Sequence, residues 1–223
     1  MPMPRPAALL LIAGLALAGG ALAVGALAQG EPPAGAGASP PTPPGVLKTA
    51  ADFQSIKDPA ARSLALFAEA GKVIQSPRCL NCHPATRVPT QGDDLHPHDP
   101  PMVAGEAGHG PDGLPCRSCH GPANVATFGE HIKSMPGDPK WAVAPAKMAW
   151  QGKSLGAICA QLKDPARNGG KTLAQLQKHM AHDHLVGWAW NPGEGRKPAA
   201  GTQAQLGDLV QAWIDTGAKC PKA

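Results

Sequence analysis

The pentapeptides CLNCH at residues 79–83 and CRSCH at residues 116–120 decide how this chain is expected to fold. Their cysteines and histidines are Cys79, Cys82, His83, Cys116, Cys119 and His120. Each pentapeptide has the C-x-x-C-H pattern of covalent haem attachment, in which two thiols form thioethers to the vinyl groups of one porphyrin. The histidine that follows then supplies a nitrogen ligand to the iron. The two copies predict two covalently bound c-type haems, with His83 and His120 as iron ligands.

Two C-x-x-C pairs could also form a structural zinc site. The common zinc pattern separates its pairs by about 15–20 residues, whereas 33 residues (83–115) separate Cys82 from Cys116. A zinc site gives no reason for a histidine after both pairs. A redox-active C-x-x-C explains neither the duplication nor the histidines. Haem attachment therefore accounts for more of the pattern than either alternative.

The N-terminal segment has the order of features found in a secretory signal peptide. Arg5 precedes an apolar run over residues 7–28, and residues 26–28 read Ala-Leu-Ala, a small-x-small cleavage site. We predict a signal peptide over residues 1–28 and therefore a periplasmic protein. An uncleaved membrane anchor is the alternative, because a run of about 22 apolar residues is long enough to span a bilayer.

The composition changes after this segment. Residues 29–46 are rich in Pro, Gly and Ala and predict a disordered linker, and residues 47–223 have the length of one domain. The chain has no Tyr, three Phe and five Trp, so two buried porphyrins would supply apolar surface that the side chains lack. The formal net charge is +4. Because there is no basic stripe with interleaved aromatic residues, nucleic acid is not expected as a partner.

Capping residues and apolar spacing predict a mainly helical domain with long loops. Asp58-Pro59 predicts the start of a helix that ends before Ser76 and leads into the first motif. The expected buried face of this helix contains Leu64, Phe67, Gly71 and Ile74. Further helix starts are predicted at Ser154, Thr172 and Thr202, the last two with capping boxes. Gly217 predicts the end of the last helix, and residues 84–115 predict an irregular loop around a haem.

The identity of the second axial ligand decides what a haem iron does. The candidates are His96, His98, His109, His131, His179, His182, His184, Met102, Met135, Met148 and Met180. Helical spacing after Thr172 favours His184 or His179 as ligands if the helix continues regularly, and directs His182 away from the buried face.

Three further segments resemble a group of small bacterial dihaem c-type cytochromes: residues 161–170 (QLKDPARNGG), 179–183 (HMAHD) and 187–193 (GWAWNPG). Together with the two C-x-x-C-H motifs, the likeness extends from about Phe67 to Pro221. The resemblance implies a mainly α, loop-rich, cytochrome c-like dihaem domain over residues 47–223. Members of this group are described as partners or subunits of molybdenum-containing hydroxylases of the isoquinoline 1-oxidoreductase type.

The resemblance also implies axial ligands and packing. It ranks His98 and His182 first as distal ligands, with His179 close behind, whereas Met148 is the best methionine alternative. It further implies that the C-terminal helix packs across the N-terminal helix near a haem.

Cys159 and Cys220 are the two cysteines outside the motifs. In an exported protein, an even remaining pair predicts a disulfide bond. Two free thiols are the alternative.

These observations predict an electron carrier that transfers electrons between a redox enzyme and a respiratory acceptor, and not an enzyme in its own right. The sequence has no serine-hydrolase, zinc-protease or phosphate-loop motif. Any hydroxylation would take place on a partner chain, such as a molybdenum hydroxylase, because no molybdenum site is visible. The alternative is a small peroxidase-like haem enzyme with one open iron site.

Overall fold

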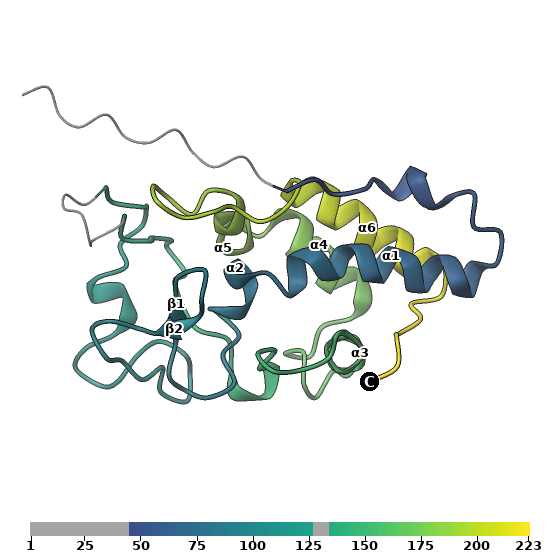
Figure 1. The fold of residues 1–223 in the computed structure, drawn as a ribbon. Coiled ribbons are helices and arrows are strands. Elements are labelled where there is room, and N and C mark those ends of the chain that lie inside the picture. Colours follow the sequence, from purple (N-terminus) through teal and green to yellow (C-terminus); the bar gives the residue numbers. More distant parts are fainter. Residues whose placement is uncertain (1–44, 127–133) are drawn as a thin grey trace, which may run out of the picture. The chain divides into compact units, whose positions relative to one another are not determined.

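Helix α6 (Gln203–Asp215) packs against both α1 (Pro59–Ile74) and α4 (Leu173–His182) (Figure 1). This computed structural model describes residues 45–126 and 134–223. Its shorter helices are η1 (Ala50–Phe53), α2 (Pro77–Leu80), η2 (Cys116–Ser118), η3 (Ala146–Met148), α3 (Leu155–Leu162), α5 (His184–Gly187) and η4 (Trp188–Trp190). The mainly α class predicted from the sequence is therefore confirmed.

The predicted helix starts are confirmed because their caps are formed. The Asp58 side chain accepts hydrogen bonds from the backbone amides of Ala60 and Ala61 at the start of α1. The Ser154 hydroxyl accepts from Ala157 at the start of α3. Helices α4 and α6 both begin with the expected capping box, and each box satisfies backbone amides that have no partner within the helix.

The core is formed by α1, α3, α4 and α6. Phe67 and Trp213 are almost fully buried, and their ring centroids are 4.8 Å apart. Gly71 allows a close approach to α3, because a Cβ at this position would lie 2.6 Å from Leu155 Cδ2. Leu64 was expected on the buried face, but it is 37% exposed. That expectation is wrong for Leu64, although the rest of the predicted face is buried.

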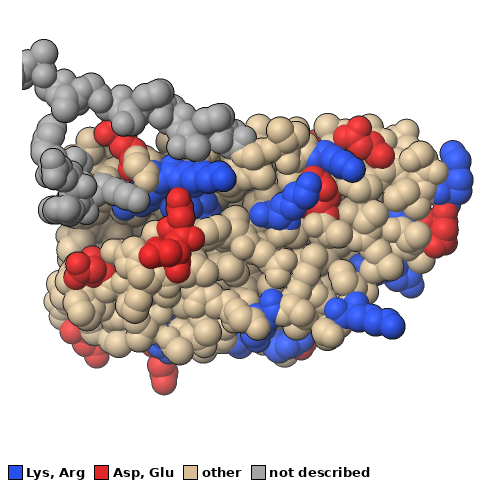
Figure 2. Space-filling view, viewed as in Figure 1, with Lys and Arg blue, Asp and Glu red and all other residues tan. Residues whose placement is uncertain are grey.

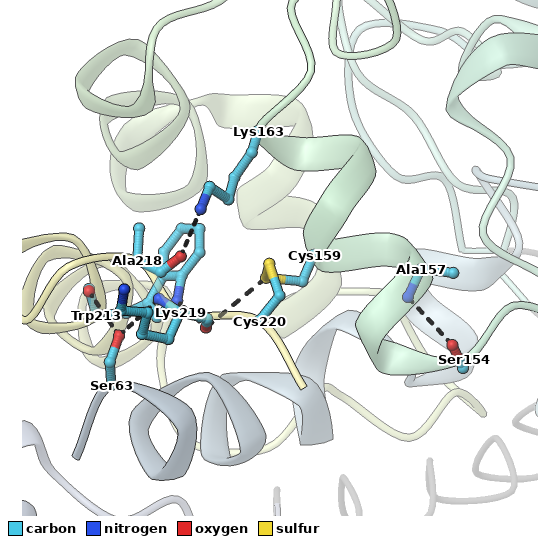
Figure 3. The surroundings of a disulfide bond; sticks show 9 residues. All are labelled: Ser63, Ser154, Ala157, Cys159, Lys163, Trp213, Ala218, Lys219 and Cys220. Carbon is cyan, nitrogen blue, oxygen red and sulfur yellow. Dashed lines mark hydrogen bonds between the residues drawn. A yellow bond between two sulfur atoms is a disulfide. The ribbon is translucent and has the colours of Figure 1, made fainter. Parts of the chain in front are cut away.

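The predicted disulfide bond between Cys159 and Cys220 is present, with a Cα–Cα distance of 5.5 Å (Figure 3). It joins α3 to the segment that follows α6. Two hydrogen bonds hold the same segment, since Lys163 Nζ donates to the carbonyl of Ala218 at 2.8 Å and Trp213 Nε1 donates to that of Lys219 at 2.8 Å.

The segment between the two motifs is largely irregular, as expected, but it contains one short sheet. Strands β1 (Thr90–Gln91) and β2 (His96–Pro97) are antiparallel, with Thr90 opposite Pro97 and Gln91 opposite His96. This sheet was not predicted, because a pair of two-residue strands leaves no alternating pattern in the sequence.

The expected signal peptide (1–28) and all but the last two residues of the expected linker (29–46) lie outside the described residues. Within residues 45–126 and 134–223, no helix is both long and apolar enough to cross a bilayer. On the face shown in Figure 2, basic and acidic side chains are interspersed.

Candidate haem sites

The first motif forms a tight turn that places its histidine beside its first cysteine. Helix α2 carries Cys79, and the amides of Cys82 and His83 both donate to the Cys79 carbonyl, at 3.2 and 3.1 Å. The His83 ring stacks on Trp150, with centroids 3.7 Å apart and planes 5° apart. His83 Nδ1 lies 2.7 Å from the carbonyl oxygen of Met148. Because a carbonyl only accepts, Nδ1 carries the proton and donates it, and the lone pair of Nε2 is left for a metal ion.

The second motif repeats this arrangement with different partners. The amides of Cys119 and His120 donate to the Cys116 carbonyl, at 3.2 and 2.9 Å. His120 Nδ1 donates to the carbonyl of Pro136 at 2.8 Å, and its ring stacks on Trp141 at a centroid distance of 4.6 Å. Both motif histidines are thus held by a backbone carbonyl and a tryptophan ring, with Nε2 left for a metal ion.

Burial keeps both motif histidines neutral, which is the form that binds a metal. It lowers the pKa of His83 to about 4, against a smaller opposing effect of the hydrogen bond to Met148. Burial also lowers the pKa of His120. At neutral pH neither ring would need to lose a proton before it bound iron.

The zinc alternative has little support in this structure. Burial raises the pKa of Cys79 to about 12 and that of Cys82 to about 11, whereas zinc binds thiolates. In the described part of the chain, no three His, Cys, Asp or Glu side chains come together as a site for a metal ion. A haem iron needs no such group, because the porphyrin supplies four of its ligands.

A cavity of about 430 Å³ lies beside the first motif. Such a volume falls in the range of about 300–1,000 Å³ that is typical of ligand and cofactor sites. The walls are mainly apolar and come from several helices, with Ile74, Leu162, Leu176, Met180, Leu185 and Leu206 among the lining residues. Cys79, Cys82 and His83 also line this cavity, so a porphyrin attached to the two cysteines would be enclosed by apolar side chains.

His179 lines the same cavity as His83. Its Nδ1 lies 3.5 Å from the Asp183 carboxylate, so this contact does not involve Nε2. Burial lowers the pKa of His179, with Asp183 opposing this effect. A charge on His179 would in turn lower the pKa of His83, so the two rings are close enough to interact electrostatically. Of the predicted distal histidines, His179 is the one that lines the cavity of the first motif.

His182 and His184 lie elsewhere. His182 is the last residue of α4, is exposed, and lines neither of the two cavities described here. The expectation for His184 assumed a continuous helix, but Asp183 has an extended backbone and caps the separate helix α5. The side chain of His184 is 82% exposed and pairs with the buried carboxylate of Asp138. The regular-helix argument for His184 is therefore wrong.

Met148 also lines the first cavity, and its backbone carbonyl accepts the hydrogen bond from His83 Nδ1. The backbone of this methionine alternative is thus held next to the motif histidine. His96 and His109 are exposed, and His131 lies outside the described residues.

His98 lies beside the second motif. Its ring centroid is 5.9 Å from that of His120, with the planes at 70°. These two rings are close enough that His98 and His120 would hold one iron together if a haem were attached at this motif. His98 Nδ1 donates to the Pro100 carbonyl at 2.8 Å, so its Nε2 is also left for a metal ion. The spacing and the hydrogen bonds fit a shared iron.

The second site is smaller and nearer the surface. His98 and His120 line a hollow of about 70 Å³, and Cys119 is exposed. A porphyrin attached at this motif would keep an edge in solvent. The two cavities share part of their walls, through Arg78, Cys82, Ala142, Val143 and Trp188. The two candidate haem sites are therefore neighbours.

Comparison with known proteins found no matching family model, no similar curated protein and no similar solved structure. The likeness to dihaem cytochromes therefore rests on the motif residues and segments of this chain alone.

Proposed function

We propose that this chain binds two c-type haems covalently, one at each motif, and carries electrons between a redox enzyme and a respiratory acceptor. The observation that carries the proposal is the repeated arrangement at the motifs. In both, the histidine donates Nδ1–H to a backbone carbonyl, stacks on a tryptophan and leaves Nε2 available. Coincidence is a poor explanation for such a repeat at two C-x-x-C-H sequences.

The axial ligands follow from the rings that lie near each motif. We assign His83 and His179 to the first iron, and His120 and His98 to the second. When bound, the two haems would supply reversible one-electron oxidation and reduction of iron. Two histidine ligands give a lower reduction potential than one histidine and one methionine. Both haems are therefore expected to have lower potentials than a haem with one histidine and one methionine ligand.

A carrier is favoured over a peroxidase-like enzyme because a second histidine is available near each motif histidine: His179 lines the cavity of His83, and His98 lies beside His120. Both irons would then be closed to small oxidants. The shared wall between the cavities also favours electron exchange between the two sites. The proposal also includes a periplasmic location, which the signal-peptide pattern supports, and a molybdenum hydroxylase partner, which the resemblance to dihaem cytochromes implies.

Haem content is the first test. The full chain is produced together with a c-type haem attachment system and denatured, and its haem is counted by pyridine haemochrome absorbance. We expect two haems per chain, and one haem each in the Cys79→Ala/Cys82→Ala and Cys116→Ala/Cys119→Ala variants. A wild-type chain without covalent haem would refute the proposal.

Electron paramagnetic resonance of the oxidised, haem-loaded protein tests the ligands. We expect two low-spin signals in the wild type. Replacement of His98 or His179 by Ala should convert one haem to high spin, whereas His182→Ala, the matched control on α4, should keep both low-spin signals. If His98→Ala and His179→Ala both keep two low-spin haems, the ligand assignment is wrong. A high-spin signal in the wild type would instead favour the enzyme.

A further inference from the structure

Arg78 is a buried cation in the wall between the two cavities. Its side chain is only 2% exposed, yet it lines both cavities. Its hydrogen bonds within the described residues, to the Gly92 carbonyl and the Asp93 carboxylate, both leave from Nη2. A guanidinium has five N–H donors, so Nε and Nη1 of Arg78 have no acceptor among these residues.

Arg196 is a second cation at the same wall. It lines the smaller cavity with Arg78, and its hydrogen bond within residues 45–126 and 134–223 goes from Nη1 to Ser134 Oγ at 2.6 Å. Burial lowers the pKa of Arg196, and the charge of Arg78 lowers it further, against an opposing effect of Asp93. The two guanidinium groups are thus close enough to repel each other.

The charges at this wall do not balance. Two arginines face one carboxylate, Asp93, whose side chain is 52% exposed and so is partly screened by water. A buried charge is costly unless an opposite charge compensates it. A planar guanidinium with free N–H donors pairs best with a carboxylate or phosphate. An additional anion inside the cavities would compensate the charge of the two arginines.

We propose that Arg78 and Arg196 form a carboxylate-binding site that holds propionate groups of the bound haems, with Arg78 serving both haem sites. This inference rests on the proposed function, since the carboxylates belong to haem. Arg78 would tie the two sites together, because one cation would influence the reduction of both irons. Arg196 would act on the second haem, whose cavity it lines.

The test uses the haem-loaded full chain and three charge-removing variants: Arg78→Gln, Arg196→Gln and Lys57→Gln. Lys57 is exposed and lines neither cavity, so it is the matched control. Spectroelectrochemical titration measures the reduction potential of each haem, and resonance Raman spectra record the propionate bending bands. These bands respond to hydrogen bonds at the propionate and not to a distant charge.

Loss of a nearby positive charge disfavours the reduced, less positive iron. We expect Arg196→Gln to lower the potential of one haem, so that less than half of it is reduced at the wild-type midpoint, and to shift its propionate bands to lower frequency. Arg78→Gln should lower the potentials of both haems. Arg196→Lys, which keeps the charge and a hydrogen-bond donor, should leave the potential closer to the wild-type value than Arg196→Gln does. Lys57→Gln should change neither quantity.

The outcomes separate the inference from the proposed function. A wild-type chain without haem would overturn both. Two haems per chain with unchanged propionate bands in Arg196→Gln would overturn the inference alone. If Arg78→Gln fails to fold, Arg196→Gln still tests whether an arginine binds a propionate. Sulfate at constant ionic strength tests for a free anion as the occupant. A wild-type potential that moves with sulfate would overturn the propionate assignment.

Discussion

Removal of the disulfide between Cys159 and Cys220 should lower the stability of this domain by a calculable amount. The two residues are 61 positions apart in the sequence. On the chain-entropy model, opening a loop of this size costs about 4 kcal/mol, because the unfolded chain gains conformational freedom. For a domain of this length, 1 kcal/mol corresponds to about 2–4 °C in Tm, so the expected loss is about 8–16 °C.

The native state should change little when the disulfide is removed. Lys163 Nζ still donates to the Ala218 carbonyl, and the Lys219 amide still donates to Ser63 Oγ at 2.9 Å. These contacts keep the C-terminal segment in place, so most of the effect acts on the unfolded chain.

The assay is thermal unfolding of the wild type and Cys220→Ala, followed by far-ultraviolet circular dichroism with and without reductant. The reduced wild type should unfold at the temperature of the variant, and the variant should not respond to reductant. A difference below about 3 °C between the wild type and Cys220→Ala would refute the entropy argument. A variant that responds to reductant as strongly as the wild type would show that another bond is being broken.

Two further substitutions test other contacts. Burial raises the pKa of Glu69, but its hydrogen bonds to Lys72 Nζ at 2.7 Å and to a backbone amide outweigh this, so the net pKa is lowered. Its stabilisation is therefore present above the ordinary pKa of 4.5 and is lost as pH falls through the lower folded value. Glu69→Gln should cost about 1–2 kcal/mol at neutral pH and flatten the acid side of a urea-unfolding series against pH; an unchanged acid limb would contradict this. Trp150→Ala, which removes the ring stacked on His83, should cost about 3–5 kcal/mol in urea unfolding. Trp150→Phe should retain most of that stability, and equal losses in the two variants would contradict a stacking role.

The helix starts could be read from the sequence because caps are local. Asp58, Ser154, Thr172 and Thr202 each bond to amides two or three residues ahead, and such signals need no tertiary information. The wrong expectation for His184 also concerns a local cap. Asp183 is itself a cap, with its side chain accepting from the amides of Leu185 and Val186. The expectation for His184 considered apolar spacing alone, and so it continued the helix that begins after Thr172 beyond Asp183.

The partners of the motif histidines could not be read in the same way. The carbonyl that accepts from His83 is 65 positions away, and that of His120 is 16 positions away. Every residue has a backbone carbonyl, so no residue type marks these acceptors. The tryptophans were a usable signal, since Trp141 and Trp150 stand out in a chain without Tyr. The carboxylate-binding role proposed for Arg78 could not be predicted either, because an arginine beside a motif is usually a surface residue.

The two candidate sites relate differently to the fold. The first cavity is lined by Ile74, Leu162, Leu176 and Leu206, which belong to the hydrophobic core formed by α1, α3, α4 and α6. A group bound there would complete that core, so folding and cofactor binding would be linked as they are in small metal-dependent domains. In the described residues, none of the side chains that line the second hollow belongs to this core. If the proposal holds, one haem would be built into the core and the other would be held by loops near the surface, where electrons from a partner protein would most easily enter or leave.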